Sequence, residues 1–217
     1  MSDAGPAGAA AQKKTLIATE RDEAARARWR EEMARVDAGT VVFLDETSTR
    51  TTMTRSRGRA PRGERVIGAV PRNHGNNVTC LAALTPTGIQ APLVFEQALT
   101  GDIFVPWLRE WLLPNLAPGT TIVLDNLSVH RHANARTVVA AAGCHLHYLP
   151  AYSPDFNPIE LAFAKLKTHL RGTARRTYDT LVDAIGTGVD QISAADATAW
   201  YRHCGYRLTP HEQEQPL

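Results

Sequence analysis

The sequence predicts an α/β fold in which a mixed sheet is flanked by helices, and three observations support this. Short apolar runs typical of buried strands occur at 41–44 and 121–124, and each leads directly into an aspartate. Two longer apolar runs, 78–84 and 89–95, are joined by a short turn rich in Pro, Thr and Gly, the pattern of an antiparallel hairpin. Strand-like and helix-like segments alternate after residue 100, which favours a mixed sheet.

The remaining elements follow from caps and periodicity. Residues 1–13 are predicted to be a disordered leader, and residues 14–40 a linker helix capped by Thr19 and ended by Gly39. Short strands are expected at 66–70 and 145–149, and helices at 101–113, at 133–142 and in the C-terminal part. The main domain is therefore predicted to span 41–207, followed by a tail over 208–217.

Composition excludes several classes of protein. Hydrophobic residues make up 43% and charged residues 21% of the 217, with a net charge of +2, as in ordinary globular proteins. No apolar stretch is long enough to span a membrane, and the N-terminus lacks a signal-peptide pattern, so a cytoplasmic protein is expected. The three cysteines are far apart, which favours buried thiols over a disulfide framework or a zinc ribbon.

Positive charge is concentrated in one segment, residues 50–72, which we call the basic segment. It contains seven arginines, no lysine and a single acidic residue, Glu64. This composition is compatible with a solvated loop, but arginine favours phosphate contacts, so the segment is a candidate DNA-binding surface. The arginines are Arg50, Arg55, Arg57, Arg59, Arg62, Arg65 and Arg72.

Two candidate acids stand at the ends of predicted buried strands. Asp45 follows the run 41–44, and Asp125 follows the run 121–124. A carboxylate there is costly unless it is paired, hydrogen-bonded or bound to a metal. Either aspartate alone could equally serve as a strand-end turn or cap.

A third candidate acid, Glu160, opens a predicted helix. Asn157 is expected to cap this helix and Gly172 to end it, and Glu160 could serve only in a capping box with Asn157. Lys167 and Arg171 lie on the same predicted helix face as Glu160, so basic groups follow the acid.

Three carboxylates of this kind suit hard cations. Mg²⁺ prefers oxygen ligands, and two such ions could activate an attacking hydroxyl and stabilise a leaving oxygen in phosphoryl transfer. The sequence has neither a GxSxG motif nor a phosphate-binding GxxxxGK[ST] loop, so a serine nucleophile and ATP are not implied.

Three motifs together resemble the bacterial insertion-sequence branch of the mariner-like DDE transposases. They are Phe43-Leu44-Asp45-Glu46-Thr47, then Leu124-Asp125-Asn126-Leu127-Ser128-Val129-His130, and the stretch from Leu149 to Glu160 that reads LPAYSPDFNPIE. Positions 126–159, 34 residues, separate the second acid from the third, an interval typical of this superfamily.

The resemblance implies a ribonuclease H-like fold with a five-stranded mixed sheet. It also implies a dependence on two Mg²⁺ or Mn²⁺ ions and cut-and-paste transposition into TA-rich targets. Asp45, Asp125 and Glu160 match the catalytic, metal-binding positions, and Asn126 and His130 match recurrent auxiliary ones. For His130 a cap or a surface histidine remains an alternative. The expected partner is double-stranded DNA, with a homodimer in the synaptic complex.

The N-terminal region departs from the family. Only 44 residues precede Asp45, and none of residues 1–40 resembles the helix-turn-helix modules that family members carry there. We therefore expect these modules to come from an upstream reading frame or a partner chain. The protein itself is expected in the bacterial cytoplasm, associated with the nucleoid when it is bound to DNA. Two alternatives stay open: a non-catalytic DNA-binding or regulatory remnant, and a stand-alone nuclease of the same fold. Predicted DNA contacts are Arg55, Arg57, Arg59, Arg62, Lys167 and Arg171.

Overall fold

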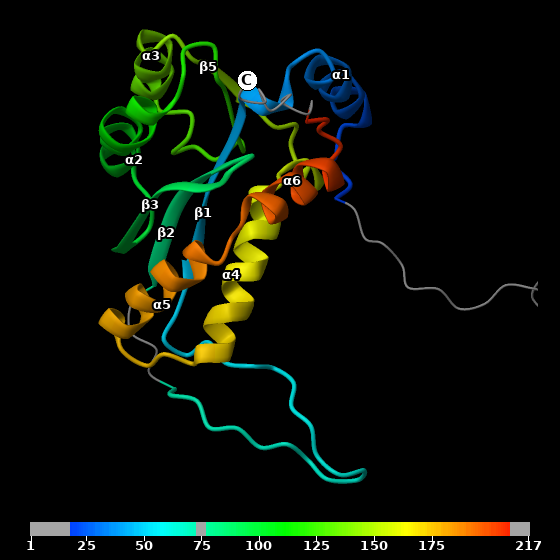
Figure 1. The fold of residues 1–217 in the computed structure, drawn as a ribbon, viewed down its shortest axis with the longest axis vertical. Coiled ribbons are helices and arrows are strands. Elements are labelled where there is room, and N and C mark those ends of the chain that lie inside the picture. Colours follow the sequence, from blue (N-terminus) through cyan, green and yellow to red (C-terminus); the bar gives the residue numbers. More distant parts are fainter. Residues whose placement is uncertain (1–17, 73–76, 209–217) are drawn as a thin grey trace, which may run out of the picture.

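A computed structural model of the protein describes residues 18–72 and 77–208 (Figure 1). The predicted leader and nearly all of the predicted tail lie outside these residues. The strands are β1 (Val41–Thr49), β2 (Val78–Thr85), β3 (Gly88–Glu96), β4 (Thr121–Leu124) and β5 (His145–Tyr148). The α-helices are α1 (Glu23–Met33), α2 (Gly101–Trp107), α3 (Ala133–Ala141), α4 (Ile159–Thr173), α5 (Tyr178–Asp190) and α6 (Ala194–His203).

The five strands form one mixed sheet, as predicted, and their order across it is β3-β2-β1-β4-β5. β1 pairs antiparallel with β2 and parallel with β4, while β2 pairs with β3 as the expected hairpin and β4 with β5 in parallel. The turn of the hairpin ends at Gly88, whose φ of 130° lies in the region that favours glycine. β1 is therefore the central strand, with neighbours on both sides.

Alternation along β1 divides the core into two layers. Val41 and Phe43 face the layer covered by α4, α5 and α6, whereas Val42 and Leu44 face the layer covered by α2 and α3. All four side chains are buried, as expected for a strand with helices on both faces. Figure 1 shows the two sets of helices on opposite sides of the sheet.

Several predicted boundaries are wrong. α1 begins at Glu23 because Asp22, not Thr19, accepts a hydrogen bond from the amide of Ala25. It ends at Met33, well before Gly39, which lies in a separate 3-10 turn. The predicted linker helix over 14–40 is accordingly much shorter among the described residues.

Two further differences concern helix α4 and the predicted strand at 66–70. α4 continues past Gly172 to Thr173, and Ala174 ends it in the left-handed conformation at φ 50°. Residues 66–70 form no strand and stay exposed, because no neighbouring strand pairs with them. The helix at 101–113 continues beyond α2 as a π turn and then a 3-10 turn that contains Pro114.

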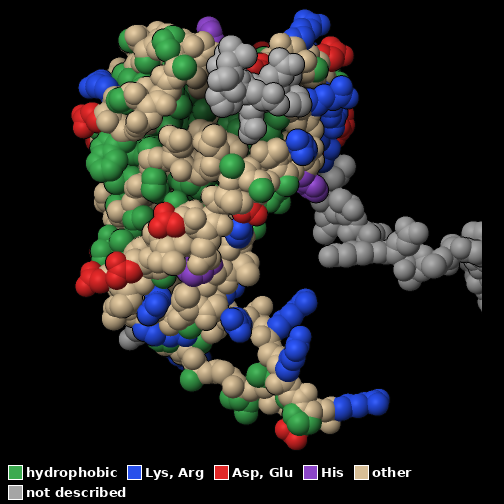
Figure 2. Space-filling model, viewed as in Figure 1, with side chains coloured by type: hydrophobic (Ala, Val, Ile, Leu, Met, Phe, Trp, Pro, Cys, Tyr) green, Lys and Arg blue, Asp and Glu red, His purple; other side chains and the backbone are tan. Residues whose placement is uncertain are grey.

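The basic segment leaves β1 and projects from the body of the molecule. Its residues from Thr54 to Arg72 are exposed and lack regular structure. Figure 2 shows basic side chains along this projection, all of them arginines, with little acidic charge beside them. At its root, Arg176 donates hydrogen bonds to the carbonyls of Thr51 (2.8 Å) and Met53 (3.0 Å).

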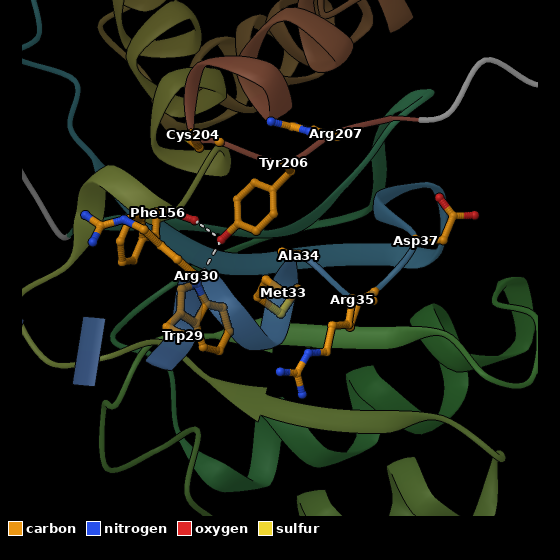
Figure 3. Close-up of a pocket in the computed structure, with 12 residues that line it drawn as sticks. Trp29, Arg30, Met33, Ala34, Arg35, Asp37, Phe156, Cys204, Tyr206 and Arg207 are labelled. Carbon is orange, nitrogen blue, oxygen red and sulfur yellow. Dashed lines mark hydrogen bonds between the residues drawn. The ribbon is translucent and has the colours of Figure 1, made fainter. Parts of the chain in front are cut away.

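Helix α1 packs against the segment between β5 and α4. Arg26 is only 1% exposed, donates two hydrogen bonds to the Asp155 carboxylate (2.9 and 2.6 Å) and lies 4.0 Å from the Phe156 ring centroid. The hydroxyl of Tyr206 accepts from Trp29 Nε1 (3.3 Å) and donates to the Phe156 carbonyl (2.7 Å), as Figure 3 shows. Three distant parts of the chain are thus joined at one place.

Within the described ranges, no helix is both long and apolar enough to cross a bilayer.

Replacing Asp155 with Ala is expected to lower the free energy of unfolding at pH 7 by about 2 kcal/mol, because the buried Arg26 guanidinium loses its two hydrogen bonds to that carboxylate and keeps only the longer contact with Glu23, at 3.4 Å. The hydrogen bond from Arg26 lowers the pKa of Asp155 below its ordinary 3.8. The contribution is therefore present above that pH and is lost as the pH falls through the folded-state pKa. Denaturant titrations at several pH values measure it. Arg30→Ala, on an exposed arginine of the same helix, is the control and should cost less than about 0.5 kcal/mol.

Candidate active site

The parallel pairing of β1 and β4 brings the first two candidate acids together. Phe43 is opposite Val123 in this pairing, so two further positions along each chain lead to Asp45 and Asp125. Asp125 directly follows β4, as predicted. Asp45, however, is not at a strand end: β1 continues to Thr49 through its pairing with β2. It lies just beyond the point where the paired part of β4 stops.

Asp45 is a buried carboxylate with two neutral donors. Its side chain accepts from the amide of Glu46 (2.8 Å) and from Asn157 Nδ2 (3.0 Å), and the residue is 7% exposed. Burial, followed by the negative charges of Glu46, Asp125 and Glu160, raises the pKa of Asp45 to about 8. In the absence of a cation, the protein therefore disfavours the ionised form.

Asp125 is held by a histidine. Its Oδ1 accepts from the amide of Leu127 (3.0 Å) and lies 2.7 Å from Nδ1 of His130. Burial acts to raise the pKa of Asp125, but the hydrogen bonds from His130 and Leu127 outweigh it and lower the pKa. Asp125 is consequently ionised where Asp45 is not.

His130 is completely buried and bridges two carboxylates, one in β1 and one just past the end of β4. Its Nδ1 contacts Asp125, while its Nε2 lies 3.1 Å from Oε2 of Glu46, which follows Asp45 in β1 and points to the face of the sheet opposite Asp45. Burial alone would lower the pKa of His130, but the hydrogen bonds and charges of Asp125 and Glu46 raise it to about 9. The ring is therefore an imidazolium at neutral pH, and neither a helix cap nor a surface histidine.

Glu160 lies in the first turn of α4 and is exposed. The predicted capping box with Asn157 does not form, because the Asn157 side chain is directed to Asp45 and Pro158 occupies the N-cap position. The amide of Glu160 instead donates to the backbone carbonyl of Asn157 at 3.2 Å.

Asp45, Asp125 and Glu160 line one cavity of about 400 Å³, closed on one side by the loop 149–154. A larger cavity of about 590 Å³, drawn in Figure 3, lies between α1 and the C-terminal segment and contains none of the three acids. The smaller cavity is the one whose lining matches the chemistry.

The oxygen ligands of this cavity fit a hard cation, although the acids do not converge on a single point in this structure. Among residues 18–72 and 77–208, no three His, Cys, Asp or Glu side chains converge into a metal-binding cluster. The lining acids supply oxygen ligands only, their charges oppose one another at Asp45, and Asn157 Oδ1 is buried without a hydrogen-bond partner in the described structure. A bound cation would relieve this repulsion.

The predicted DNA-contacting residues lie outside the cavity. Arg57, Arg59 and Arg62 are exposed on the projecting part of the basic segment. The Arg55 guanidinium packs beside Gly172 at the C-terminal end of α4 and lines a shallow hollow there. Lys167 and Arg171 follow Glu160 along α4, with Arg171 roughly 16 Å further along the helix axis.

The structure also clarifies the auxiliary positions. The Asn126 side chain donates to the Leu149 carbonyl and accepts from Arg131, so it ties the chain after β4 to the loop lining the cavity. No role was predicted for Glu46, which contacts His130 Nε2, or for Tyr148. The Tyr148 hydroxyl donates to the His130 carbonyl at 2.9 Å. A signal for Glu46 was present, since an acid on the face opposite Asp45 requires its own partner.

Comparison with known proteins agrees with this arrangement. A family model described as DDE superfamily endonuclease matches residues 40–182, more than half of the chain. The transposase of the transposable element Tc1 from Caenorhabditis elegans is 32% identical over 78 residues, which cover 36% of this chain and 29% of that protein. The matched part of that relative is thus less than a third of its length.

Two solved structures share the fold. The crystal structure of the Mos1 mariner paired end complex with Mn has a TM-score of 0.70 at 13% identity, covering 91% of this chain and 64% of that one. The Mos1 transposase catalytic domain with Raltegravir and Mg has a TM-score of 0.65 at 12% identity, covering 87% of this chain and 92% of that domain. By its family match this protein belongs to the DDE superfamily endonucleases, and its five-stranded sheet has the ribonuclease H-like fold of the Mos1 catalytic domain.

Proposed function

We propose that this protein is a transposase catalytic domain that cleaves DNA strands and joins them to a target by metal-dependent phosphoryl transfer. One observation carries the proposal: the register of β1 and β4 brings Asp45 beside Asp125, in a cavity that Glu160 also lines. Family membership and the length of the match to the Mos1 catalytic domain support it.

The proposed ligands of two Mg²⁺ or Mn²⁺ ions are Asp45, Asp125 and Glu160. Solved structures of Mos1 contain Mg or Mn, which supports this choice of cation. Bound ions supply an activated hydroxyl and stabilise the leaving oxygen. We expect the three acids to move closer to one another when cations bind, because they form no metal-binding cluster among the described residues.

The protein's own groups orient and balance the acids. His130 holds one oxygen of Asp125, and Glu46 balances the charge of His130 at the other ring nitrogen. We infer that His130 is a positioning residue, because its hydrogen bond fixes which Asp125 oxygen stays free to face the cavity. Asn126 positions the loop that lines the cavity by its bond to Leu149.

DNA is the proposed substrate, and its backbone would follow α4 away from the cavity. Lys167 and Arg171 lie along this helix, and Arg55 lies at its end, where the basic segment begins to project. Arg57, Arg59 and Arg62 would contact phosphates further out. Mos1 is solved as a paired end complex, which supports DNA as the partner.

The biological setting belongs to the same proposal. We place the chain in the bacterial insertion-sequence branch, acting at TA-rich targets as a homodimer in a synaptic complex. Helix-turn-helix modules from an upstream-frame product would recognise the element ends, and the protein would act in the cytoplasm beside the nucleoid. The motifs around the three acids support this branch.

A non-catalytic DNA-binding remnant is the second candidate, favoured by the lack of a converged acid cluster among the described residues. A stand-alone nuclease is the third. Metal-dependent nicking excludes the remnant. Joining of a cleaved 3′ end to a second duplex separates a transposase from a nuclease.

Asp45→Asn, Asp125→Asn and Glu160→Gln are each expected to reduce Mg²⁺-dependent nicking of supercoiled plasmid by about a thousandfold or more. Each removes a charged oxygen ligand, and several kcal/mol of transition-state stabilisation correspond to such a factor. Asp190→Asn, at the exposed end of α5, is the control and should nick like the wild type. Wild-type rates in all three variants would disprove the assignment.

The Asp45→Asn variant is also expected to be more stable than the wild type in metal-free buffer at pH 8.5, by about 2–5 kcal/mol. The folded-state pKa of about 8 exceeds the ordinary 3.8, so wild-type stability declines as the pH rises from about 4 to 8. At pH 4 the two proteins should unfold alike. Adding Mg²⁺ should raise the wild-type unfolding temperature more than that of the variant, and equal shifts would argue against a cation at Asp45.

Replacing Arg57, Arg59 and Arg62 together with Ala is expected to weaken DNA binding and flatten its salt dependence. Each lost phosphate contact lowers the slope of log K against log salt by about 0.9, so a decrease of about 2–3 is expected. Fluorescence anisotropy at several salt concentrations measures the slope. A variant with Arg28, Arg30 and Arg35 of the α1 region replaced by Ala removes equal charge and should change the slope by less than one unit.

A further inference from the structure

The Asn157 side chain contacts the first acid of the site and does not cap the helix that follows it. It is 3% exposed, and its Nδ2 donates to Asp45 Oδ2 at 3.0 Å. The N-cap position of α4 is Pro158, and no side chain caps this helix end by a hydrogen bond. The usual structural reason for an asparagine before a helix therefore does not apply here.

The same residue is also joined to the third acid through its backbone. Its carbonyl accepts from the amide of Glu160 at 3.2 Å, and its own amide donates to the Pro154 carbonyl at 2.9 Å. The side chain thus fixes Asp45 on β1 while the main chain fixes the start of α4. Asn157 consequently links the positions of Asp45 and Glu160, which lie 115 residues apart in sequence.

The orientation of the Asn157 amide has a cost. With Nδ2 directed to Asp45, Oδ1 is buried and has no hydrogen-bond partner among the described residues. An unsatisfied buried acceptor lowers the stability of the fold. The reverse orientation would place two oxygens against each other whenever Asp45 is ionised. An apolar side chain of the same size would avoid this cost, so stability alone does not explain the asparagine.

A neutral donor suits an acid that has to bind a cation. Among the described residues, Asp45 accepts hydrogen bonds from two neutral N–H groups and forms no ion pair with Lys, Arg or His. Asp125 differs, because one of its oxygens lies 2.7 Å from Nδ1 of His130. A cationic partner at Asp45 would compensate the charge that attracts the metal, whereas an amide orients the carboxylate and leaves that charge in place.

We propose that Asn157 is a positioning residue for the metal-binding acids, which holds the Asp45 carboxylate toward the cavity and sets its spacing from Glu160. This inference rests on the proposed function, because it assumes that Asp45 and Glu160 bind a cation. It assigns to Asn157 an effect on metal affinity, distinct from any effect on folding.

Asn157→Leu tests the proposal, because leucine has a similar volume and neither the donor nor the unsatisfied acceptor. Mn²⁺ binding to the DNA-free protein, measured by electron paramagnetic resonance, is expected to weaken by about tenfold. The Mg²⁺ concentration for half-maximal plasmid nicking should rise by the same factor, while nicking at saturating Mg²⁺ falls much less. Stability in EDTA, measured by denaturant titration, should stay equal or increase.

Thr49→Val is the matched control, because it also replaces a buried polar side chain by an apolar one of similar size and removes a buried hydrogen bond, to the Val78 carbonyl at 3.0 Å, outside the cavity. It is expected to change the Mn²⁺ affinity by less than twofold. If Asn157→Leu binds Mn²⁺ like the wild type, or loses stability without losing affinity, the inference is overturned while the proposed function stands. If the wild type neither binds Mn²⁺ nor nicks DNA, the proposed function fails, and the inference with it.

Discussion

The parallel register between β1 and β4 is the constraint on which the rest of the site depends. It brings two aspartates side by side, Asp45 buried in the sheet and Asp125 partly exposed just past β4, so that their charges repel and Asp45 loses solvation. The fold must therefore supply donors for each acid or keep it protonated. The other residues of the site meet this requirement, because they supply the hydrogen-bond donors of the two acids.

The two acids differ in their hydrogen-bond donors and in the direction of their pKa shifts, because they have different neighbours. Asp125 lies beside an imidazolium that a third carboxylate, Glu46, stabilises by its contact with the other ring nitrogen. Asp45 has neutral donors only, and its pKa is raised to about 8. A pair of acids pushed apart in pKa in this way is typical of functional sites, since a structural role would favour full compensation.

The periphery of the domain keeps these elements in place. α1 packs through Arg26 and Trp29 against the segment that leads into α4, so the N-terminal helix stabilises the start of the helix that carries Glu160. At the other end of α4, Arg55 and Arg176 fix the root of the basic segment. One helix therefore connects the acidic cavity with the positively charged projection, which is the arrangement that a nucleic-acid backbone requires.

The sequence by itself determined the sheet class and the hairpin, and it singled out the three acids and the basic segment as candidates, because apolar periodicity and local charge can be read directly from the chain. It did not determine that β1 continues beyond Asp45, since that depends on pairing with β2. It suggested a helix cap for Asn157, where the structure has a bond to Asp45, and it gave no role to Glu46, whose partner His130 is 84 positions away. Local propensity cannot decide between a nearby backbone donor and a distant side chain. Only tertiary packing, which brings both within hydrogen-bonding distance, makes that choice.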